Sequence, residues 1–477
     1  MTTFLIGLGI LIFGGALYGR FMERFFGVED RPTPAVVKND GKEYVPMPTW
    51  KCALVHLLNI AGTGPVLGPI LGFIFGPIVF ITIPLGCVFA GAVHDYMIGM
   101  ISIREDGAQM QDLVNKYLGK HIALLFDVFI CLMALLVVVT FTYSPGDIVV
   151  TNFLNQKADV SNHWTWVAYA VIFIYYILAT YMPIDKLIGR VYPVIGSLFI
   201  LSAVIIFALI FLKKLPLEEL SWANWRGKDS NMNLIPSFFV TVACGIASGF
   251  HSTQATLIAR SVKHERCGRK VFFNMMLVEG FIAMIWAAVA MGVAAKFKFS
   301  NPKDPNLTLV EIIRFLLGSK FGIIVMAGFI VLPITTGGTT MRVLRIIMSE
   351  LLKIKKENLL GKILLGAFIV IASLSLLLFV KFQPDGFSII WRYFAWANQT
   401  IVVFTLAVVT AYMVRQKKLI VFTVLPGAFY LFVVSSFILN AEFGFNLSWD
   451  KSYLISGLLS LAFIGYFSWK KYLTGKA

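Results

Sequence analysis

The sequence contains little charge and none of the motifs by which hydrolases and metal-dependent enzymes are recognised. Of its 477 residues 14% are charged and 58% are hydrophobic, and the mean hydropathy is +0.81. No His-Glu-x-x-His or Gly-x-Ser-x-Gly pattern occurs, and the five cysteines match neither a disulfide framework nor a metal site. We therefore expect neither a soluble domain nor an enzyme, and we expect no cofactor.

Apolar runs long enough to span a bilayer occur throughout the chain. They predict an all-α polytopic membrane protein with about thirteen transmembrane helices, surrounded by membrane lipid. The predicted spans are 2–19, 51–70, 74–103, 121–142, 163–182, 187–212, 234–258, 271–297, 320–347, 361–381, 389–414, 418–438 and 452–470.

The net charge of +16 comes from basic residues that are spread over many loops, so nucleic-acid binding is not expected. Alternate loops are rich in lysine and arginine, which assigns them to the cytoplasm by the positive-inside rule. With thirteen spans, the N-terminus is then outside and the C-terminus is cytoplasmic. Residues 1–19 are predicted to form a peripheral transmembrane helix, and residues 20–50 a polar cytoplasmic linker.

Residues 56–69 are apolar and yet cannot form one continuous helix. Pro65 and Pro69 have no backbone N–H to donate, and Gly62, Gly64 and Gly68 ease the departure from helical geometry. At membrane depth, the freed backbone groups need protein, water or a ligand as partners. A break is predicted here, although a proline kink packed against neighbouring helices explains this segment alone equally well.

A second interruption falls at residues 241–256, where glycines and polar side chains divide the seventh span. The two breaks are five spans apart, and their spans run in opposite directions. Interrupted helices at matching places in two inverted halves are typical of the central site of a secondary transporter. The predicted five-helix repeats are 51–212 and 234–414, and 418–477 are predicted to form peripheral C-terminal helices.

The expected substrate site lies at these breaks. Half-helix N-termini near residues 64–67 and 252–254 would offer free N–H groups to a carboxylate. The freed carbonyl oxygens near Ala61 and Ala247 could hold a cation or an ammonium group. The eleventh span adds two deep amides that need partners. The predicted substrate-binding residues are Ala61, Gly62, Thr63, Gly64, Gly249, His251, Ser252, Thr253, Gln254, Asn398 and Gln399.

Four ionisable residues in apolar spans are predicted to carry protons, namely His56, His94, Asp95 and Glu279. His94 and Asp95 are explained equally well as anchors of a helix end near the membrane interface. Glu279 is expected to titrate or to pair with a basic residue or His56. His251 is expected either to titrate near neutral pH or to stay neutral on a backbone carbonyl.

Threonines in the ninth span offer hydroxyl oxygens that suit an alkali cation. Thr335, Thr336 and Thr339 are therefore a possible sodium site. Close packing of helices through small residues, including Gly337 and Gly338, explains the same segment at least as well.

Several separate motifs together are similar to those of one known family. They are residues 56–69, Gly91 to Tyr96 with Ser102, Arg104 and Gly107, residues 249–254 with Ala259 and Arg260, Glu279 to Phe281 with Trp286 and Ala287, Thr339 with Arg342 and Arg345, and residues 391–399. The set resembles the carbon starvation protein A (CstA) family. The resemblance implies a bacterial inner-membrane transporter of peptides or pyruvate, the latter with protons. It also implies a LeuT-like five-plus-five inverted repeat related to the amino acid–polyamine–organocation superfamily.

Two positions depart from the pattern of that family. The family commonly has Gly-Asp-Thr where this chain has Gly337, Gly338 and Thr339, so coupling through that carboxylate is in doubt. Ala255 and Thr256 stand where Ser-Pro is usual.

The favoured function is import of a short peptide or a small carboxylate such as pyruvate, coupled to protons, by alternating access. A sodium-coupled symporter of amino acids is the first alternative. An uncoupled facilitator or channel is the second, although the carbonyl filter or charged ring expected of a channel is not found.

Overall fold

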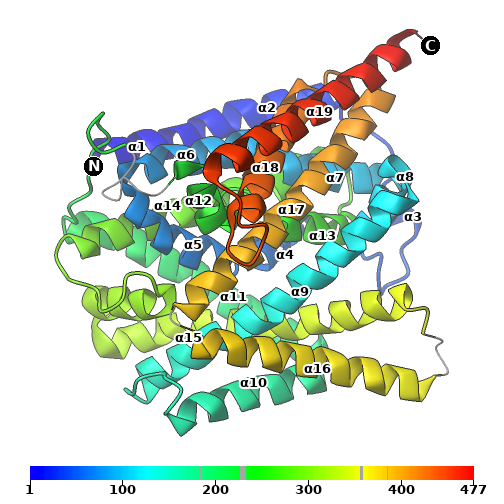
Figure 1. The fold of residues 1–477 in the computed structure, drawn as a ribbon. Helices are drawn as coiled ribbons and strands as arrows, with labels where there is room; N and C mark the ends of the chain where they lie inside the picture. Colours follow the sequence, from blue (N-terminus) through cyan, green and yellow to red (C-terminus); the bar gives the residue numbers. More distant parts are fainter. Residues whose placement is uncertain (182–184, 226–232, 355–357, 384, 477) are drawn as a thin grey trace. The chain divides into compact units, whose positions relative to one another are not determined.

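The computed structural model describes residues 1–181, 185–225, 233–354, 358–383 and 385–476, and helices joined by loops make up these ranges (Figure 1). Within them, β-structure is limited to an isolated bridge between Met47 and Val262. The α-helices are α1 (Thr2–Gly9), α2 (Gly15–Phe26), α3 (Pro34–Val37), α4 (Thr49–Ile60), α5 (Gly64–Gly72), α6 (Val79–Gly86), α7 (Ala92–Arg104), α8 (Met110–Leu118), α9 (Lys120–Ile148), α10 (His163–Tyr181), α11 (Asp185–Leu212), α12 (Leu234–Val242), α13 (Gly249–Ala259), α14 (Asn274–Ala294), α15 (Pro305–Leu351), α16 (Leu359–Phe382), α17 (Gly386–Arg415), α18 (Val421–Asn440) and α19 (Trp449–Lys476).

Short 3-10 and π-helical segments connect some of these helices. They are η1 (Ile10–Gly14), η2 (Phe73–Ile78), η3 (Cys87–Gly91), η4 (Val149–Phe153), η5 (Ala243–Gly245), η6 (Glu265–Cys267) and η7 (Arg269–Phe273). The chain from α1 through η1 to α2 is one helical run that ends at Gly27, whose φ of 74° only glycine adopts readily. The expected linker therefore begins later than predicted, because residues 20–26 continue the first helix.

Eleven helical stretches in the described ranges are long and apolar enough to cross a membrane, as expected of a polytopic membrane protein. Two of the thirteen predicted spans, 51–70 and 187–212, are not among the eleven. The first is divided between α4 and α5, and the second contains the shorter apolar stretch Gly196–Leu212. The number thirteen therefore stays a prediction.

The helices group into two compact units. Unit 1 contains Met1–Phe126, Glu218–Met284 and Asn398–Ala477, and unit 2 contains Asp127–Leu217 and Ile285–Ala397. Each unit takes helices from both of the predicted repeats. In unit 1, α7 packs against α13, α5 against α12, and α18 against α19; in unit 2, α10 and α11 both pack against α15.

Both predicted breaks are present, and both lie in unit 1. α4 ends at Ile60 and α5 begins at Gly64, with Pro65 in its first turn, where no N–H is needed. α12 ends at Val242, and the next residue, Ala243, has a φ of 32°, which interrupts helical geometry.

The prediction that the second half-helix begins near residues 252–254 was wrong. Ser248 is extended and α13 already begins at Gly249. The hydroxyls of Ser252 and Thr253 donate to the carbonyls of Gly249 and Phe250, each at 2.7 Å. These polar side chains therefore bond to their own helix and are compatible with a helical backbone.

Two further segments outside the predicted spans are helical. Residues 109–118 correspond to α8, which starts with a capping box formed by Gln109 and Asp112. Residues 306–317 are the first part of α15, which bends at Gly318, where φ is 70°.

Candidate functional site

The two breaks lie against each other in unit 1. A Cβ added to Gly64 would lie 2.6 Å from the Cβ of Cys244, and one added to Gly68 would lie 2.7 Å from the carbonyl oxygen of Val242. A side chain at either position would displace backbone or its direct neighbours, so glycine lets α5 approach the end of α12 closely. The two breaks thus form one structural feature.

The deep amides of α17 bind the backbone groups that the second break leaves free. Asn398 Oδ1 accepts from the N–H of Phe250 at 2.9 Å, and its Nδ2 donates to Ser248 Oγ at 2.9 Å. Gln399 Nε2 donates to the carbonyl oxygen of Phe239 at 2.8 Å. These bonds stabilise the broken helix, because backbone groups freed at membrane depth need hydrogen-bond partners. A role of Asn398 and Gln399 in binding substrate stays a prediction.

A buried chain of titratable side chains lies beside the second break. Asp95 Oδ1 is 2.7 Å from His94 Nδ1, and Asp95 Oδ2 is 3.2 Å from His251 Nδ1. His251 Nε2 is 3.4 Å from Glu279 Oε2. All four side chains are buried. We call Asp95, His251 and Glu279 the acid–histidine cluster; its members come from α7, α13 and α14.

His251 connects two carboxylates through its two ring nitrogens. Only the imidazolium form carries a proton on both nitrogens and can donate to Asp95 and Glu279 together. In the neutral form one of the two carboxylates has no donor on this ring. The protonation of His251 and that of its acids are therefore coupled, which is the arrangement a proton carrier needs.

Several polar atoms around the cluster have no hydrogen-bond partner among the described residues. They are both ring nitrogens of His56, Nε2 of His94, and both carboxylate oxygens of Glu279, whose contact with His251 is at ion-pair distance. The His56 ring packs edge-on against Phe272, with 5.3 Å between centroids. Buried polar groups in native structures are normally paired, so these atoms distinguish this part of unit 1 as the candidate site.

The structure brings the predicted proton-carrying residues together and clarifies two alternatives. His94 and Asp95 are fully buried and lie well before the end of α7, so they do not anchor a helix at the interface. Among the described residues, Glu279 forms an ion-pair contact with His251 and none with a lysine or arginine. Of the predicted substrate-binding residues, Thr63 lies at the first break with its buried hydroxyl unpaired within the described chain.

The predicted sodium ligands lie in a continuous part of α15 in unit 2. Thr335 Oγ1 donates to the carbonyl of Leu332 at 2.8 Å, and Thr339 Oγ1 donates to that of Thr336 at 2.9 Å. A Cβ on Gly337 would lie 2.1 Å from the hydroxyl of Tyr176, which supports the helix-packing interpretation. In the described ranges, no three His, Cys, Asp or Glu residues are grouped to hold a metal ion.

Sequence analysis missed a buried ion pair in unit 2. Lys381 Nζ donates to both oxygens of Asp147 at 2.9 Å and to the carbonyl of Ala158 at 2.7 Å. The Tyr169 hydroxyl donates to Asp147, and the ammonium group lies 4.5 Å from the ring centroid of Tyr143. A lysine and an aspartate inside apolar runs were the available signal.

Unit 2 also contains a cavity of about 400 Å³ whose lining includes charged and amide side chains, in the size range of ligand pockets. Asp147 at its wall is paired with Lys381, and Asp304 accepts from two N–H groups at the start of α15. Arg314 donates to the carbonyl oxygen of Thr151 at 2.9 Å. These charged groups already have partners within the unit, so the cavity presents fewer free groups than the acid–histidine cluster.

Comparison with known proteins identifies relatives that are similar in sequence. A Haemophilus influenzae protein described as an uncharacterized membrane protein is 37% identical over 340 residues, which are 61% of this chain and 91% of that protein. The Escherichia coli peptide transporter CstA is 27% identical, over 54% of this chain and 44% of the relative. The Escherichia coli pyruvate/proton symporter BtsT is 26% identical, over 55% and 44%. The match thus spans less than half of these two transporters.

Solved structures show a similar fold. A manganese transporter of Eremococcus coleocola, in complex with an aromatic bis-isothiourea compound, has a TM-score of 0.56 at 12% identity. The match covers 91% of this chain and 97% of that one. At this identity the likeness concerns the fold alone.

The sequence profile described as carbon starvation protein CstA matches residues 1–168, 146–312 and 306–436. The motifs that suggested this relationship include both helix breaks and the helices that carry Asp95, His251 and Glu279. The chain belongs to the carbon starvation protein CstA family.

Proposed function

We propose that this membrane protein is a proton-coupled secondary transporter that imports a short peptide or a small carboxylate such as pyruvate by alternating access. The observation that carries the proposal is the acid–histidine cluster, with Asp95 and Glu279 at distances of 3.2 and 3.4 Å from the two nitrogens of His251. Its position beside the paired helix breaks links proton uptake to a place where substrate can bind.

In the proposed cycle, His251 and Glu279 take up a proton when the site faces the side of higher proton concentration. Protonated His251 donates to both acids, and loss of that proton leaves one acid without a donor. Because a buried unpaired carboxylate is costly, proton release favours a rearrangement of α7, α13 and α14. Substrate would bind at the Thr63 hydroxyl and at the backbone N–H groups of the first turn of α5.

We also propose the finer points of the architecture predicted from sequence, namely the five-plus-five inverted repeat over 51–212 and 234–414 and a cytoplasmic C-terminus. The contact between the two breaks supports the repeat, because inverted halves place their discontinuous helices at one centre. The variants Lys38→Cys and Lys303→Cys, each labelled with a thiol reagent that does not cross the membrane, would test the orientation. We expect labelling of Lys38→Cys from the cytoplasmic side and of Lys303→Cys from the outer side.

The function is tested by uptake of labelled pyruvate and of a labelled dipeptide into proteoliposomes. Each substrate is offered with an inward proton gradient, an inward sodium gradient or neither. We expect accumulation of one substrate that depends on the proton gradient. Accumulation driven by sodium would support the alternative, and Thr336→Val with Thr339→Val would then remove it. Equilibration without accumulation would indicate a facilitator.

A further inference from the structure

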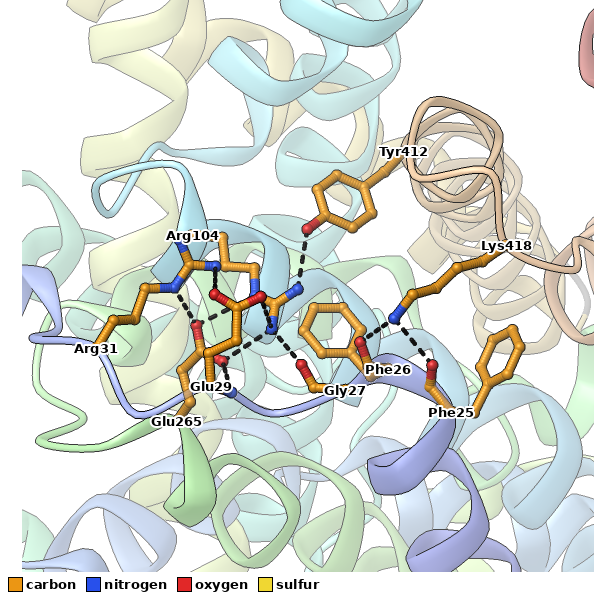
Figure 2. Close-up of polar contacts among 9 residues, drawn as sticks. All are labelled: Phe25, Phe26, Gly27, Glu29, Arg31, Arg104, Glu265, Tyr412 and Lys418. Atoms are coloured by element: carbon orange, nitrogen blue, oxygen red, sulfur yellow. Dashed lines mark hydrogen bonds and ion pairs between the residues drawn. The ribbon is translucent and has the colours of Figure 1, made fainter. Parts of the chain in front are cut away.

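The end of α7, which carries Asp95, is tied by a second buried ion pair to the start of the helical run from η6 to α14, which carries Glu279. Arg104 is the last residue of α7, and Glu265 begins η6, shortly after α13. Arg104 Nε and Nη2 donate to Glu265 Oε1 and Oε2 at 3.1 and 2.9 Å (Figure 2). The Glu265 side chain is fully buried and that of Arg104 is 7% exposed.

Residues 27–34, here called the strap, cross over this pair. The N–H of Glu29 donates to Glu265 Oε2 at 2.9 Å, and Arg31 Nε donates to Glu265 Oε1 at 2.8 Å (Figure 2). Arg104 Nη2 donates to the carbonyl of Gly27 at 2.6 Å. Glu265 therefore receives hydrogen bonds from α7 and from the strap at the same time.

The last turn of α17 and the segment after it contact Arg104 and the residues just before the strap. Arg104 Nη1 donates to the Tyr412 hydroxyl at 3.3 Å, and the guanidinium lies 4.2 Å from the ring centroid of Phe26. Lys418 Nζ donates to the carbonyl of Phe25 at 3.0 Å and also to that of Phe26 (Figure 2). Burial lowers the pKa of Lys418 below its usual value.

The strap is held by polar contacts more than by buried apolar side chains. The Glu29 and Arg31 side chains are 58% and 40% exposed, and the strap is not buried until Thr33. Segments with few apolar contacts open at lower free energy than the packed core. The strap can therefore separate from Glu265 without unfolding α7 or α13.

The path from the acid–histidine cluster to this end of the helices is filled by side chains. Arg104 follows Asp95 by nine residues, which is about 13 Å along α7. Residues 92–103 of α7 are all buried, and Ser102 Oγ lies 3.4 Å from the carbonyl oxygen of Thr256 in α13. Access to the cluster from this end requires α7 to move away from α13 and from the helical run that begins at Glu265, and the Arg104–Glu265 pair opposes that movement.

We propose that the strap and the Arg104–Glu265 pair form a lock that controls access to the acid–histidine cluster from one side. Docking of the strap supplies two of the hydrogen bonds of Glu265 and keeps the helix ends together. Its release exposes Glu265 and Arg104 to water, which lowers the cost of separating their charges. The proposal rests on the proposed function, because it describes how one gate of that transporter is held shut.

The test uses the full chain in lipid nanodiscs and two measurements that do not depend on transport. Hydrogen exchange of the peptide that contains Glu29 reports strap docking. Alkylation of Cys244 by N-ethylmaleimide, followed by peptide mass spectrometry, reports access to the break beside the cluster. The variants are Glu265→Gln and, if that variant does not fold, Arg31→Gln. Glu43→Gln is the matched control, because it removes the ion pair at 2.8 Å between Glu43 and Arg260.

In Glu265→Gln we expect exchange of the Glu29 amide to accelerate by about ten- to hundredfold, the effect of losing a hydrogen bond to a charged group. We expect Cys244 alkylation to accelerate as well, and Glu43→Gln to match the wild type in both measurements. Faster strap exchange with wild-type alkylation of Cys244 would show that Glu265 holds the strap without controlling access to the cluster, and this would overturn the proposal. Unchanged strap exchange would overturn it as well. Absence of uptake in proteoliposomes would instead count against the proposed function.

Discussion

The acid–histidine cluster in unit 1 and the Asp147–Lys381 pair in unit 2 are both buried, but their hydrogen bonding differs. Lys381 gives Asp147 two bonds of 2.9 Å, and Tyr169 gives another. Glu279 has a single contact of 3.4 Å with His251, and neither of its oxygens accepts a regular hydrogen bond in the described chain. The first arrangement fixes both charges in place, whereas the second leaves room for a proton to arrive or leave.

This difference separates charges that are held in place from charges whose hydrogen bonding can change. A buried pair with saturated hydrogen bonds is costly to break and gains nothing from a change of protonation. A buried acid beside a histidine, with unsatisfied oxygens, changes its bonding whenever either group titrates. The Asp147–Lys381 pair in unit 2 therefore has a fixed set of hydrogen bonds, whereas the bonding of the acid–histidine cluster in unit 1 depends on its protonation.

Replacing Glu279 is expected to give the largest functional effect. Glu279→Gln keeps the size of the side chain and removes its charge, so proton-driven accumulation should be lost while exchange of substrate at equilibrium persists. The free energy of unfolding should stay within about 1 kcal/mol of wild type, because no regular hydrogen bond is broken. Uptake and thermal unfolding of the same preparation measure both. Full proton-driven uptake by this variant would remove Glu279 from the mechanism.

Breaking the pair in unit 2 is expected to give the largest loss of stability. Lys381→Met leaves Asp147 buried without its cation, which should cost about 3–5 kcal/mol of unfolding free energy. The double variant Asp147→Asn with Lys381→Met should recover much of that loss. Thermal unfolding in detergent measures both variants. If the single and double variants are equally stable, Asp147 and Lys381 are not coupled.

Removing the amide that binds the second break is expected to have an intermediate effect. Asn398→Ala deletes the acceptor of the Phe250 N–H and the partner of Ser248, at a cost of about 1–3 kcal/mol. Ser248→Ala, which removes a partner of Asn398 and keeps the acceptor of the Phe250 N–H, is the control and should lose less. Equal losses in thermal unfolding would indicate that the α13 N-terminus does not depend on this contact.

A smaller effect is expected from packing between α10 and α15 in unit 2. Gly337→Ala would place a methyl group 2.1 Å from the Tyr176 hydroxyl and should cost about 1–2 kcal/mol after the gain in helix propensity. Gly338→Ala, whose Cβ would be 3.1 Å from Tyr175 Cε1, is the matched control and should be nearly neutral. The same thermal measurement distinguishes them, and the reverse order would contradict the observed packing.

An exposed carboxylate should give the smallest effect. The N–H groups of Tyr44, Lys42 and Glu43 lower the pKa of Asp40 below its usual value. A lowered folded-state pKa stabilises this turn above the unfolded pKa of about 3.9, and the contribution is lost as the pH falls through the folded value. Hydrogen exchange of residues 42–44, corrected for intrinsic rates, should lose protection on acidification. Asp40→Ala should lack that protection at neutral pH; unchanged protection there would show that other contacts hold the turn.

Helix breaks were the part of the site that the sequence predicted best. Proline and glycine act through the local backbone, so Pro65 and Gly64 placed the start of α5 correctly. The start of α13 was misplaced because the hydroxyls of Ser252 and Thr253 bond within their own helix instead of marking its end. Whether such side chains start a helix or bond inside it depends on neighbours that a local pattern does not show.

The pairing of charges could not be predicted from one sequence. Glu279 was expected to pair with a basic residue or His56, and Asp147 and Lys381 were not recognised as partners. Asp95, His251 and Glu279 are far apart along the chain and meet because α7, α13 and α14 pack together in unit 1. Hydropathy reports the depth of a side chain and carries no information on which side chain faces it.

The sequence by itself determined the class of protein, the helical architecture and the two backbone breaks, because apolarity and the chemistry of proline and glycine act over short distances. Only the tertiary structure decided that the breaks touch, that His251 lies between two acids, and that Arg104 and Glu265 tie two helix ends under the strap. These contacts form between segments distant along the chain, and their geometry is set by the packing of whole helices.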